Sequence, residues 1–408
     1  MGSCLSVEGG NAKADNNNSS SNSTVVDGNK KTVPRRSDSN KLEMRLHRIP
    51  GRFFLNGSTD FASLFNKQGK KGINQDAMIL WENFGSKEDA TFCGVFDGHG
   101  PNGHMVAKKV RDSLPLKLRA QWELNTSSKE LSDVNSSAGG SMNSAGTSVK
   151  QTHAEPKNNL GYERKENENN SVSMLKESFL KAFKVMDKEL ELHPYIDCFC
   201  SGTTAVTLIK MGQDLVIGNV GDSRAVLGTR DEDDSLIAVQ LTEDHKPNLP
   251  KEAERIRLCK GRVFAHPNEP EIARVWLPNS NSPGLAMARA FGDICLKDFG
   301  LTSVPEVSYH HVTEKDEFVV LATDGLWDAL SNEEVVGIVA SASHSSAART
   351  LVDSATRAWR IRFPTAKVDD CAAICLFLGS RLDNCCTSYL TQAQGAGIEV
   401  TETSESYE

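Results

Sequence analysis

The sequence lacks three features that would point to common classes of protein: an excess of positive charge, a long apolar run and paired Cys-x-x-Cys motifs. Its 408 residues carry a formal net charge of −8. A general nucleic-acid binder needs a clustered basic face to contact phosphates, so this balance argues against nucleic-acid binding. No apolar run approaches the ~18 residues that a membrane span needs, and the N-terminus lacks the hydrophobic region of a secretory signal.

The cysteines are numerous but do not form a metal-binding pattern. Ten are present, and without paired Cys-x-x-Cys motifs they argue against a structural zinc site. Free thiols in a reducing compartment are therefore expected. Cys198 and Cys200, in "DCFCSGTTA", are expected to lie on one face of a strand.

Hydrophobic residues make up 38% of the chain, which is low for a compact domain and predicts unstructured segments. Residues 1–50 and the stretch 125–173 are polar and of low complexity, and we expect both to be disordered. Residues 379–408 form a polar, acidic tail. The organisation predicted is one domain over 51–378, interrupted by the insertion at 125–173.

Short apolar segments within this domain predict strands, and amphipathic periods predict helices between and around them. The links "MGQ" and "GDS" are too short for parallel crossovers, so the strands that they join are expected to form antiparallel hairpins. This mixture indicates an α+β layered sandwich. The strands are expected at 204–210, 214–220, 224–230, 316–325 and 371–379, and the helices at 102–119, 174–192, 247–260 and 332–360.

Aspartates stand at the ends of several of these strands. Asp97 follows "CGVF", Asp222 follows "VIGNV", Asp324 follows "FVVLAT", and Asp369 and Asp370 precede "CAAICLFL". Each alone is typical of a turn. Because strand ends of two packed sheets can converge, and converging carboxylates repel one another unless a cation neutralises them, the set predicts a metal site.

The ligand type indicates which cation. Oxygen donors without a Cys or His pair suit Mg²⁺ or Mn²⁺. A carboxylate shared by two such ions gives a two-metal site whose bridging water is acidified and attacks phosphorus. The stretch "TFCGVFDGHG" would supply a bridging ligand at Asp97, a backbone carbonyl at Gly98 and a general acid at His99.

Several motifs agree in order with those of one family. The sequence resembles the type 2C, metal-dependent Ser/Thr protein phosphatases, in their plant-type branch, over about 71–120 and 174–378. The resemblance implies two packed antiparallel sheets flanked by helices, metals at one edge, and hydrolysis of phosphoserine and phosphothreonine in protein substrates. The motifs are "FCGVFDGHG", "SGTTA", "NVGDSRAVL", "DHKPNLPKEAERI", "LAMARAFGD", "VPEV" and "LATDGLWD".

The resemblance also assigns roles to positions that match the family motifs. It implies two Mg²⁺ or Mn²⁺ ions, a weaker third site, and a general acid. Asp97 would bridge the two metals, Gly98 would contribute its carbonyl, and Asp324 and Asp369 would complete the first metal. Asp222 and Asp328 would join Asp324 at the third site. His99 would be the acid, and Lys71 would take the place of the phosphate-binding arginine.

Three positions depart from the usual family pattern. Lys71 cannot grip a phosphate bidentately as Arg can. Gln75 stands where many relatives have a glutamate that holds a metal-bound water, although its neighbour Asp76 keeps the family's acid. Asp370 stands where the usual motif has Asn, which leaves open whether Asp369 or Asp370 is the ligand.

Two rival classes were compared with the enzyme. A catalytically dead phosphatase that only holds phosphoproteins should have lost a metal carboxylate, and none is lost. A Ca²⁺-dependent structural module should contain a compact loop of alternating acids, and no such loop is present. An active phosphatase is therefore the hypothesis that remains. We expect it to act as a monomer.

The first residues, "MGSCLS", match an acylation pattern. Gly2 follows the initiator Met, Ser6 completes the M-G-x-x-x-[ST] motif, and Cys4 offers a palmitoylation site. Eight Lys or Arg lie between Lys30 and Arg52. One acyl chain binds membranes only marginally, so a second chain or a basic stretch is needed, and both are available here. We expect a peripheral enzyme on the cytoplasmic face of the plasma membrane; without the anchor it would be cytosolic or nuclear.

Overall fold

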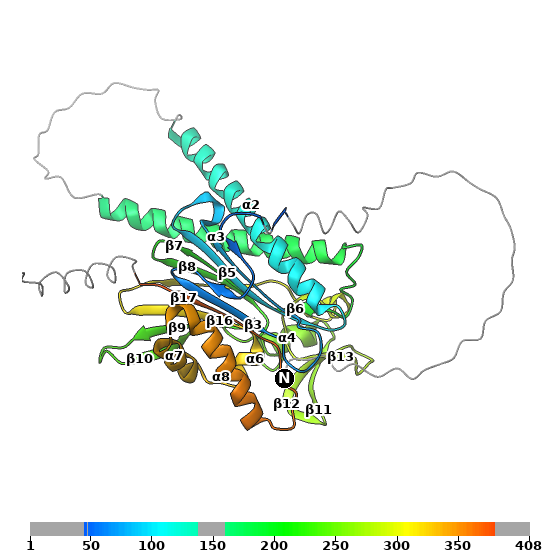
Figure 1. The fold of residues 1–408 in the computed structure, drawn as a ribbon. Helices are drawn as coiled ribbons and strands as arrows, with labels where there is room; N and C mark the ends of the chain where they lie inside the picture. Colours follow the sequence, from blue (N-terminus) through cyan, green and yellow to red (C-terminus); the bar gives the residue numbers. More distant parts are fainter. Residues whose placement is uncertain (1–44, 47, 138–159, 380–408) are drawn as a thin grey trace, which may run out of the picture.

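Two antiparallel β-sheets lie face to face at the centre of the fold, with helices on both outer faces (Figure 1). The computed structural model describes residues 45, 46, 48–137 and 160–379, with side chains of 127–137 and 160–170 left out. The predicted α+β class, with two packed antiparallel sheets between helices, is confirmed. The predictions for Gly2, Cys4, most of 1–50 and nearly all of the 379–408 tail lie outside the described residues.

The first sheet supplies the strand that carries Asp97. Its hydrogen-bonded order is β1-β4-β5-β7-β8-β15, with the short β6 pairing both β5 and β14. Its strands are β1 Arg52–Phe53, β4 Asp76–Glu82, β5 Ala90–His99, β6 Gly202–Thr203, β7 Ala205–Met211, β8 Asp214–Val220, β14 Phe291–Gly292 and β15 Glu306–His311.

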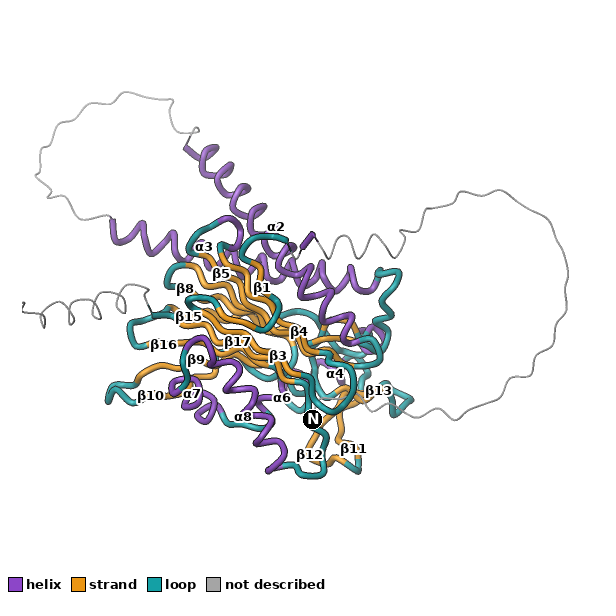
Figure 2. The backbone as a smooth tube through the Cα atoms, in the orientation of Figure 1, coloured by secondary structure: helices purple, strands orange, loops and turns teal. Residues whose placement is uncertain are grey.

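The second sheet supplies the strands beside Asp324 and Asp369. Its order is β10-β9-β16-β17-β3-β2 (Figure 2). A smaller sheet, β11-β12-β13, lies in the region 262–285. The strands are β2 Gly57–Ser58, β3 Ala62–Lys67, β9 Arg224–Arg230, β10 Leu236–Gln240, β11 Arg262–His266, β12 Glu269–Trp276, β13 Pro283–Leu285, β16 Asp316–Ala322 and β17 Cys371–Phe377.

Helices cover the two outer faces of the sandwich. Helices α2 and α3 pack on the first sheet, and α7 and α8 pack on the second (Figure 1). The helices are α2 Gly103–Ser137, α3 Leu160–Glu191, α4 Pro250–Leu258, α5 Ile294–Lys297, α6 Asp324–Trp327, α7 Asn332–Ser341 and α8 Ala347–Arg362, with 3-10 turns η1 Phe84–Ser86 and η2 His344–Ser346.

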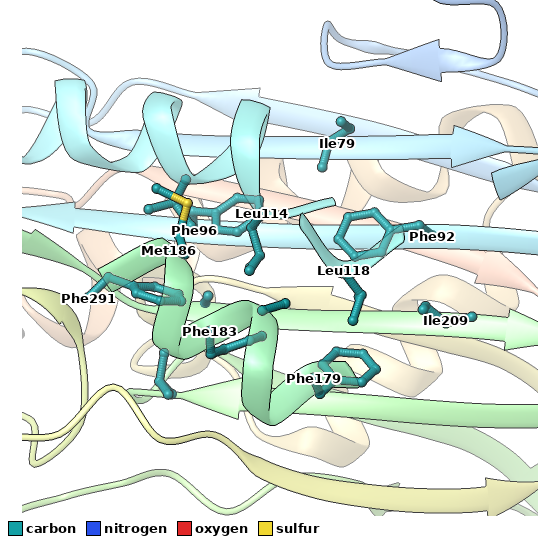
Figure 3. Close-up of a cluster of buried hydrophobic side chains, with 14 of the residues drawn as sticks. Ile79, Phe92, Phe96, Leu114, Leu118, Phe179, Phe183, Met186, Ile209 and Phe291 are labelled. Carbon is teal, nitrogen blue, oxygen red and sulfur yellow. The ribbon is translucent and has the colours of Figure 1, made fainter. Parts of the chain in front are cut away.

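The central strands of both sheets, such as β4 and β17, are buried on both faces because each sheet is covered twice. In β4, Ile79 packs under α2 and α3 while its neighbour Leu80 faces the other sheet. Figure 3 shows the first of these layers, in which aromatic side chains of β5 meet Leu114 of α2 and Phe183 of α3. Alternate residues therefore fill two different cores, as the side-chain period of two requires.

One of the two predicted hairpins is wrong. Strands β7 and β8 do form a hairpin, but β9 pairs with β10 and β16 in the other sheet. Strand β8 already has β7 on one edge and β15 on the other, so no edge is left for β9. Gly221, with φ +95°, makes the sharp turn that sends the chain across, and this crossing buries Asp222 between the sheets at 1% exposure.

The predicted helices differ from the observed ones in extent. Helix α2 continues to Ser137 and α3 begins at Leu160, so both reach into the expected insertion at 125–173. The expectation that nothing in this stretch joins a core is wrong for Val172, which is 8% exposed and packs in the cluster of Figure 3. Residues 138–159 lie outside the described part. The single helix predicted over 332–360 is two, α7 and α8.

Among the residues that the structure describes, no helix combines the length and the apolar character needed to cross a bilayer.

Candidate active site

Strand ends from both sheets meet around a cavity of about 330 Å³. Asp97 is near the end of β5, Asp324 begins α6 directly after β16, and Asp369 and Asp370 precede β17. The predicted convergence of strand-end carboxylates is therefore observed for these residues. The cavity lining is Lys71, Gly72, Ile73, Gln75, Asp97, Gly98, His99, Gly100, Pro101, His104, Asp324, Asp369 and Asp370.

The carboxyl groups of the cavity are close enough to perturb one another. Burial, followed by the charge of Asp324, raises the pKa of Asp97 well above its usual range, and the two carboxyl groups are in hydrogen-bonding contact. Burial, followed by the charge of Asp369, likewise raises the pKa of Asp324. Two buried carboxylates in contact repel each other. They therefore either share a proton or hold a cation between them.

Asp76 lies behind this group rather than on the cavity wall. It pairs with Asp97 across β4 and β5, and its carboxylate accepts a hydrogen bond of 2.7 Å from the Thr323 hydroxyl. Burial raises its pKa well above the usual range in spite of that bond, and nearby acids add to the effect. The Thr323 hydroxyl also accepts a hydrogen bond from the Ala372 amide. Thr323 therefore links Asp76 of β4 to the start of β17.

Asp369 and Asp370 differ in what their carboxylates contact. Both oxygens of Asp370 accept backbone N–H bonds, from Gly69 at 2.7 Å and from Gln75 at 2.9 Å. The carboxylate of Asp369 instead contacts the Lys71 ammonium at the cavity. Burial raises the pKa of Asp369 although Lys71 opposes the shift. Asp370 thus fixes the 69–75 segment, and Asp369 faces the open space.

Gly98 fits its position because no side chain would. A Cβ there would collide with the Gly103 carbonyl at the start of α2 and lie 2.7 Å from the Gln75 carbonyl. The strand end is therefore pressed against α2 and the 69–75 segment, and Gly98 presents only backbone to the cavity. The side-chain Oε1 of Gln75 is buried and has no hydrogen-bond partner among the described residues.

His99 makes a contact that the sequence analysis did not identify. Its Nε2 lies 2.5 Å from Oδ2 of Asp293, and the two side chains are 4% and 0% exposed. Burial alone would lower the pKa of His99, but the Asp293 carboxylate reverses this and raises it. Asp293 follows β14 in "AFGD", so the same signal of an acid beside a glycine at a strand end would have found it.

A second cluster of acids lies around Lys246, which the sequence analysis also missed. The Lys246 ammonium lies 2.5 Å from Asp222 Oδ2, and the charges of Asp222, Asp324 and Asp328 raise its pKa against the effect of burial. Burial would raise the pKa of Asp222, but Lys246 lowers it. Burial and Asp324 raise the pKa of Asp328. The three positions expected at a third metal site are therefore near one another, and a lysine lies among them.

The sequence profile of the family Protein phosphatase 2C matches residues 63–359. The chain belongs to this family. Probable protein phosphatase 2C 33 of Arabidopsis thaliana is 58% identical over 399 residues, which cover 94% of this chain and 81% of that protein. Probable protein phosphatase 2C 14 of Oryza sativa subsp. japonica is 59% identical over 345 residues, 84% of this chain and 64% of that protein.

Solved structures agree with the fold of a protein phosphatase 2C. The crystal structure of serine-threonine phosphatase 2C from Toxoplasma gondii superposes with a TM-score of 0.65 at 23% identity, covering 81% of this chain and 100% of that one. A sex determining protein of C. elegans superposes with a TM-score of 0.55 at 19% identity, covering 79% and 65%.

Membership in the protein phosphatase 2C family identifies the chain as a metal-dependent protein serine/threonine phosphatase of the plant type that acts on phosphoproteins. The donor set fits the family's Mg²⁺ or Mn²⁺, because the cavity offers carboxylates, an orphan amide oxygen and backbone. No three acidic, His or Cys side chains of the described ranges already surround one point. The Asp369 carboxylate contacts the Lys71 ammonium, so it would have to turn in order to share a cation with Asp97 and Asp324.

Proposed function

We propose that this phosphatase holds two Mg²⁺ or Mn²⁺ ions with Asp97, the Gly98 carbonyl, Asp324 and Asp369, and that His99 protonates the leaving oxygen of the substrate. One observation carries the proposal: buried carboxyl groups with raised pKa values and a histidine with a raised pKa line the same cavity. When bound, the ions supply charge neutralisation and an acidified water that serves as the nucleophile.

Asp369 rather than Asp370 is the ligand in this proposal. The two oxygens of Asp370 are both engaged by backbone N–H groups, and turning them toward an ion would leave two buried donors unsatisfied. Asp369 accepts one backbone N–H, from Asp370 on Oδ1 at 3.0 Å, while its Oδ2 contacts Lys71 and can exchange that contact for an ion. That exchange releases the Lys71 ammonium, which then faces the cavity and attracts the phosphate of the substrate as a point charge.

The weaker third site is assigned to Asp222, Asp324 and Asp328. Their mutual proximity supports it, and so does Oδ1 of Asp222, which is buried and has no partner within the described residues. Lys246 already neutralises part of this charge, so a divalent ion has to compete with an ammonium there. Weak binding at this site is the expected consequence.

The role of His99 follows from the ion pair with Asp293. A histidine whose pKa is raised keeps its proton to higher pH than an ordinary imidazole, which favours a role as an acid. Nε2 donates to Asp293, while Nδ1 is buried and has no hydrogen-bond partner in the described part of the chain. Nδ1 is therefore the nitrogen that we assign to proton transfer. Asp293 positions the ring and stabilises its charge.

Replacing His99 by Asn tests this assignment because Asn keeps a hydrogen-bonding group near Asp293 but cannot donate a catalytic proton. The rate on a phosphopeptide should fall by roughly 10²-fold or more, the usual scale of general acid catalysis. The rate on p-nitrophenyl phosphate should fall much less, since its leaving group needs little protonation. Equal losses on the two substrates would show that His99 acts in some other way.

We also propose that the enzyme is a peripheral membrane protein, anchored by a myristoyl group on Gly2 and a palmitoyl group on Cys4. The M-G-x-x-x-[ST] pattern and the basic residues up to Arg52 support this. We further propose that the catalytic domain acts as a monomer, because the proposed ligands and His99 are brought together by the fold of a single chain. Fractionation of cells expressing wild type, Gly2→Ala and Cys4→Ser is the test. Wild type should sediment with plasma membranes, and Gly2→Ala that stays on them as fully as wild type would overturn the anchor.

A further inference from the structure

Two cysteines far apart in the sequence are in contact beside the active site. The Cys200 thiol donates to the sulfur of Cys295 at an Sγ–Sγ distance of 3.3 Å. Cys200 lies in the turn before β6, not on a strand as expected from the sequence, and Cys295 lies in α5. The Phe199 carbonyl accepts the Cys295 amide at 2.9 Å, so the two backbones run side by side at this point.

Only one of the two thiols is open to a reagent in solvent. Cys200 is partly exposed, whereas Cys295 is 8% exposed and belongs to the apolar cluster beneath the β11–β13 sheet. Among the other described cysteines, only Cys259 is exposed. The neighbouring Cys198 is buried, and burial first of all raises its pKa to about 12, which keeps it an inert thiol.

The chain segments that carry Cys200 and Cys295 both contact His99. Two residues after Cys200, Gly202 pairs with His99 in the β5–β6 ladder. Two residues before Cys295, Asp293 holds the His99 ring, and its amide donates to the Ser201 carbonyl at 3.0 Å. The space is full, because a Cβ at Gly202 would collide with Asp293 Oδ2. A movement of either segment therefore changes the His99–Asp293 geometry.

We propose that Cys200 and Cys295 form a reversible intramolecular disulfide on exposure to hydrogen peroxide, and that this disulfide slows the phosphatase. The Cys200 sulfur attacks one peroxide oxygen, which gives a sulfenic acid and releases one water. The Cys295 thiol then attacks the Cys200 sulfur, the S–S bond forms, and the hydroxyl leaves as a second water. Two thiols are oxidised by two electrons and one peroxide is reduced to two waters. A dithiol reductant reverses the step.

The slowing follows from the distance that the sulfurs must travel. An S–S bond is about 2.05 Å long, so closure from 3.3 Å brings the two segments about 1 Å closer or twists them by a similar amount. A displacement of about 1 Å in a catalytic group can cost about 10²-fold in rate. The size of the effect on phosphopeptides rests on the acid role of His99 proposed above, whereas formation of the disulfide does not.

The test treats the full chain with hydrogen peroxide in Mg²⁺ buffer, removes the peroxide with catalase, and measures both covalent state and rate. Non-reducing peptide mapping should find the Cys200 and Cys295 peptides joined, with loss of two hydrogen atoms. The phosphopeptide rate should fall at least about tenfold and return with dithiothreitol. Cys200→Ser and Cys295→Ala should each keep their rate after peroxide, while the matched variant Cys259→Ser should be as sensitive as wild type.

The outcomes separate this inference from the mechanism. No Cys200–Cys295 linkage, or peroxide sensitivity in Cys200→Ser equal to that of wild type, would overturn the switch. A linkage that leaves the rate unchanged would overturn its regulatory effect. If the linkage forms and the rate on p-nitrophenyl phosphate falls as much as that on phosphopeptide, the route through His99 is wrong although the disulfide is real.

Discussion

The two ends of the β-sandwich both carry acidic cavities, and the proposed active site is the smaller one. Strands β4, β5, β16 and β17 each have one end at each cavity: β4 begins at Asp76 and ends at Glu82, and β16 runs from Asp316 toward Asp324. The distal cavity, of about 920 Å³, is lined by Glu82, Glu88, Asp89, Glu314 and Asp316 among others. The catalytic cavity measures about 330 Å³.

The two cavities differ in the groups that balance the negative charge of their carboxylates. At the distal cavity, the carboxylate of Asp316 accepts bonds from the Thr313 amide at 2.8 Å and from His310 at 2.9 Å. Burial would raise its pKa, but these and other hydrogen bonds lower it. At the catalytic cavity, burial raises the pKa values of Asp97 and Asp324, and neighbouring carboxylates add to both shifts, Asp324 for Asp97 and Asp369 for Asp324. The proposed catalytic cavity is therefore distinguished by the raised pKa values of its carboxyl groups, not by its volume or by the number of acids.

The strongest test of this comparison exchanges one carboxylate at each end. Asp97→Asn should lower turnover by about 10³-fold or more, because it removes a shared ligand worth several kcal/mol at the transition state. Asp316→Asn, which replaces an acid already satisfied by the protein, should leave kcat per folded molecule unchanged and cost about 1 kcal/mol of stability. Steady-state kinetics at saturating Mn²⁺ and urea unfolding measure the two effects. Loss of activity in Asp316→Asn would break the comparison.

A chelator tests the same point without mutation. Excess EDTA should abolish phosphopeptide hydrolysis, and added Mg²⁺ or Mn²⁺ in the millimolar range should restore it, because partly hydrated oxygen-ligand sites bind these ions weakly. Full activity in EDTA would show that the catalytic end needs no cation to balance its charge.

At the catalytic end, the neighbouring residues Asp369 and Asp370 allow the same comparison between a proposed ligand and an acid that the protein already satisfies. Asp369→Asn should reduce the rate by about 10²-fold, because a charged ligand is lost. Asp370→Asn keeps one acceptor oxygen for Gly69 or Gln75, so it should retain most of the rate and lose about 1–3 kcal/mol of stability. The reverse order of rates would mean that Asp370, not Asp369, is the ligand.

Asp293 gives a smaller effect with a diagnostic pH dependence. Its charge raises the pKa of His99 above the usual value, so the acid form persists as pH rises and is lost only above that raised pKa. Asp293→Asn should shift the alkaline limb of the phosphopeptide rate to lower pH and cut the rate at neutral pH by about tenfold. The p-nitrophenyl phosphate profile should move less. An unchanged alkaline limb would show that Asp293 does not set the protonation of His99.

The five strands predicted from local patterns lie close to observed strands, but only one of the two predicted pairings is right. The segments 214–220 and 224–230 coincide with β8 and β9, because short apolar runs between tight turns leave little choice of conformation. Their pairing was wrong because edge occupancy by β15, which is distant in sequence, decides it. Asp97, Asp324 and Asp369 were found because each ends or begins a buried strand. Lys246 was missed because its partner Asp222 comes from another element, whereas Asp293 carried the same strand-end signal and was overlooked.

Deletions in the insertion at 125–173 should have the smallest effect on catalysis. Two deletions of different length separate the residues that pack in the core from those between them. Deleting 138–159 with a short Gly/Ser linker should change neither kcat nor stability by a measurable amount, since loop length adds little closure entropy. Deleting 125–173 also removes Val172 from the core and the 2.9 Å bond from Asn125 to Ser178. That deletion should lower the free energy of unfolding by at least about 1–2 kcal/mol while kcat per folded molecule stays the same. Neither Asn125 of α2 nor Val172 of α3 lines the catalytic cavity. A loss of kcat comparable to that of Asp97→Asn in either deletion would therefore show that the insertion reaches the catalytic end.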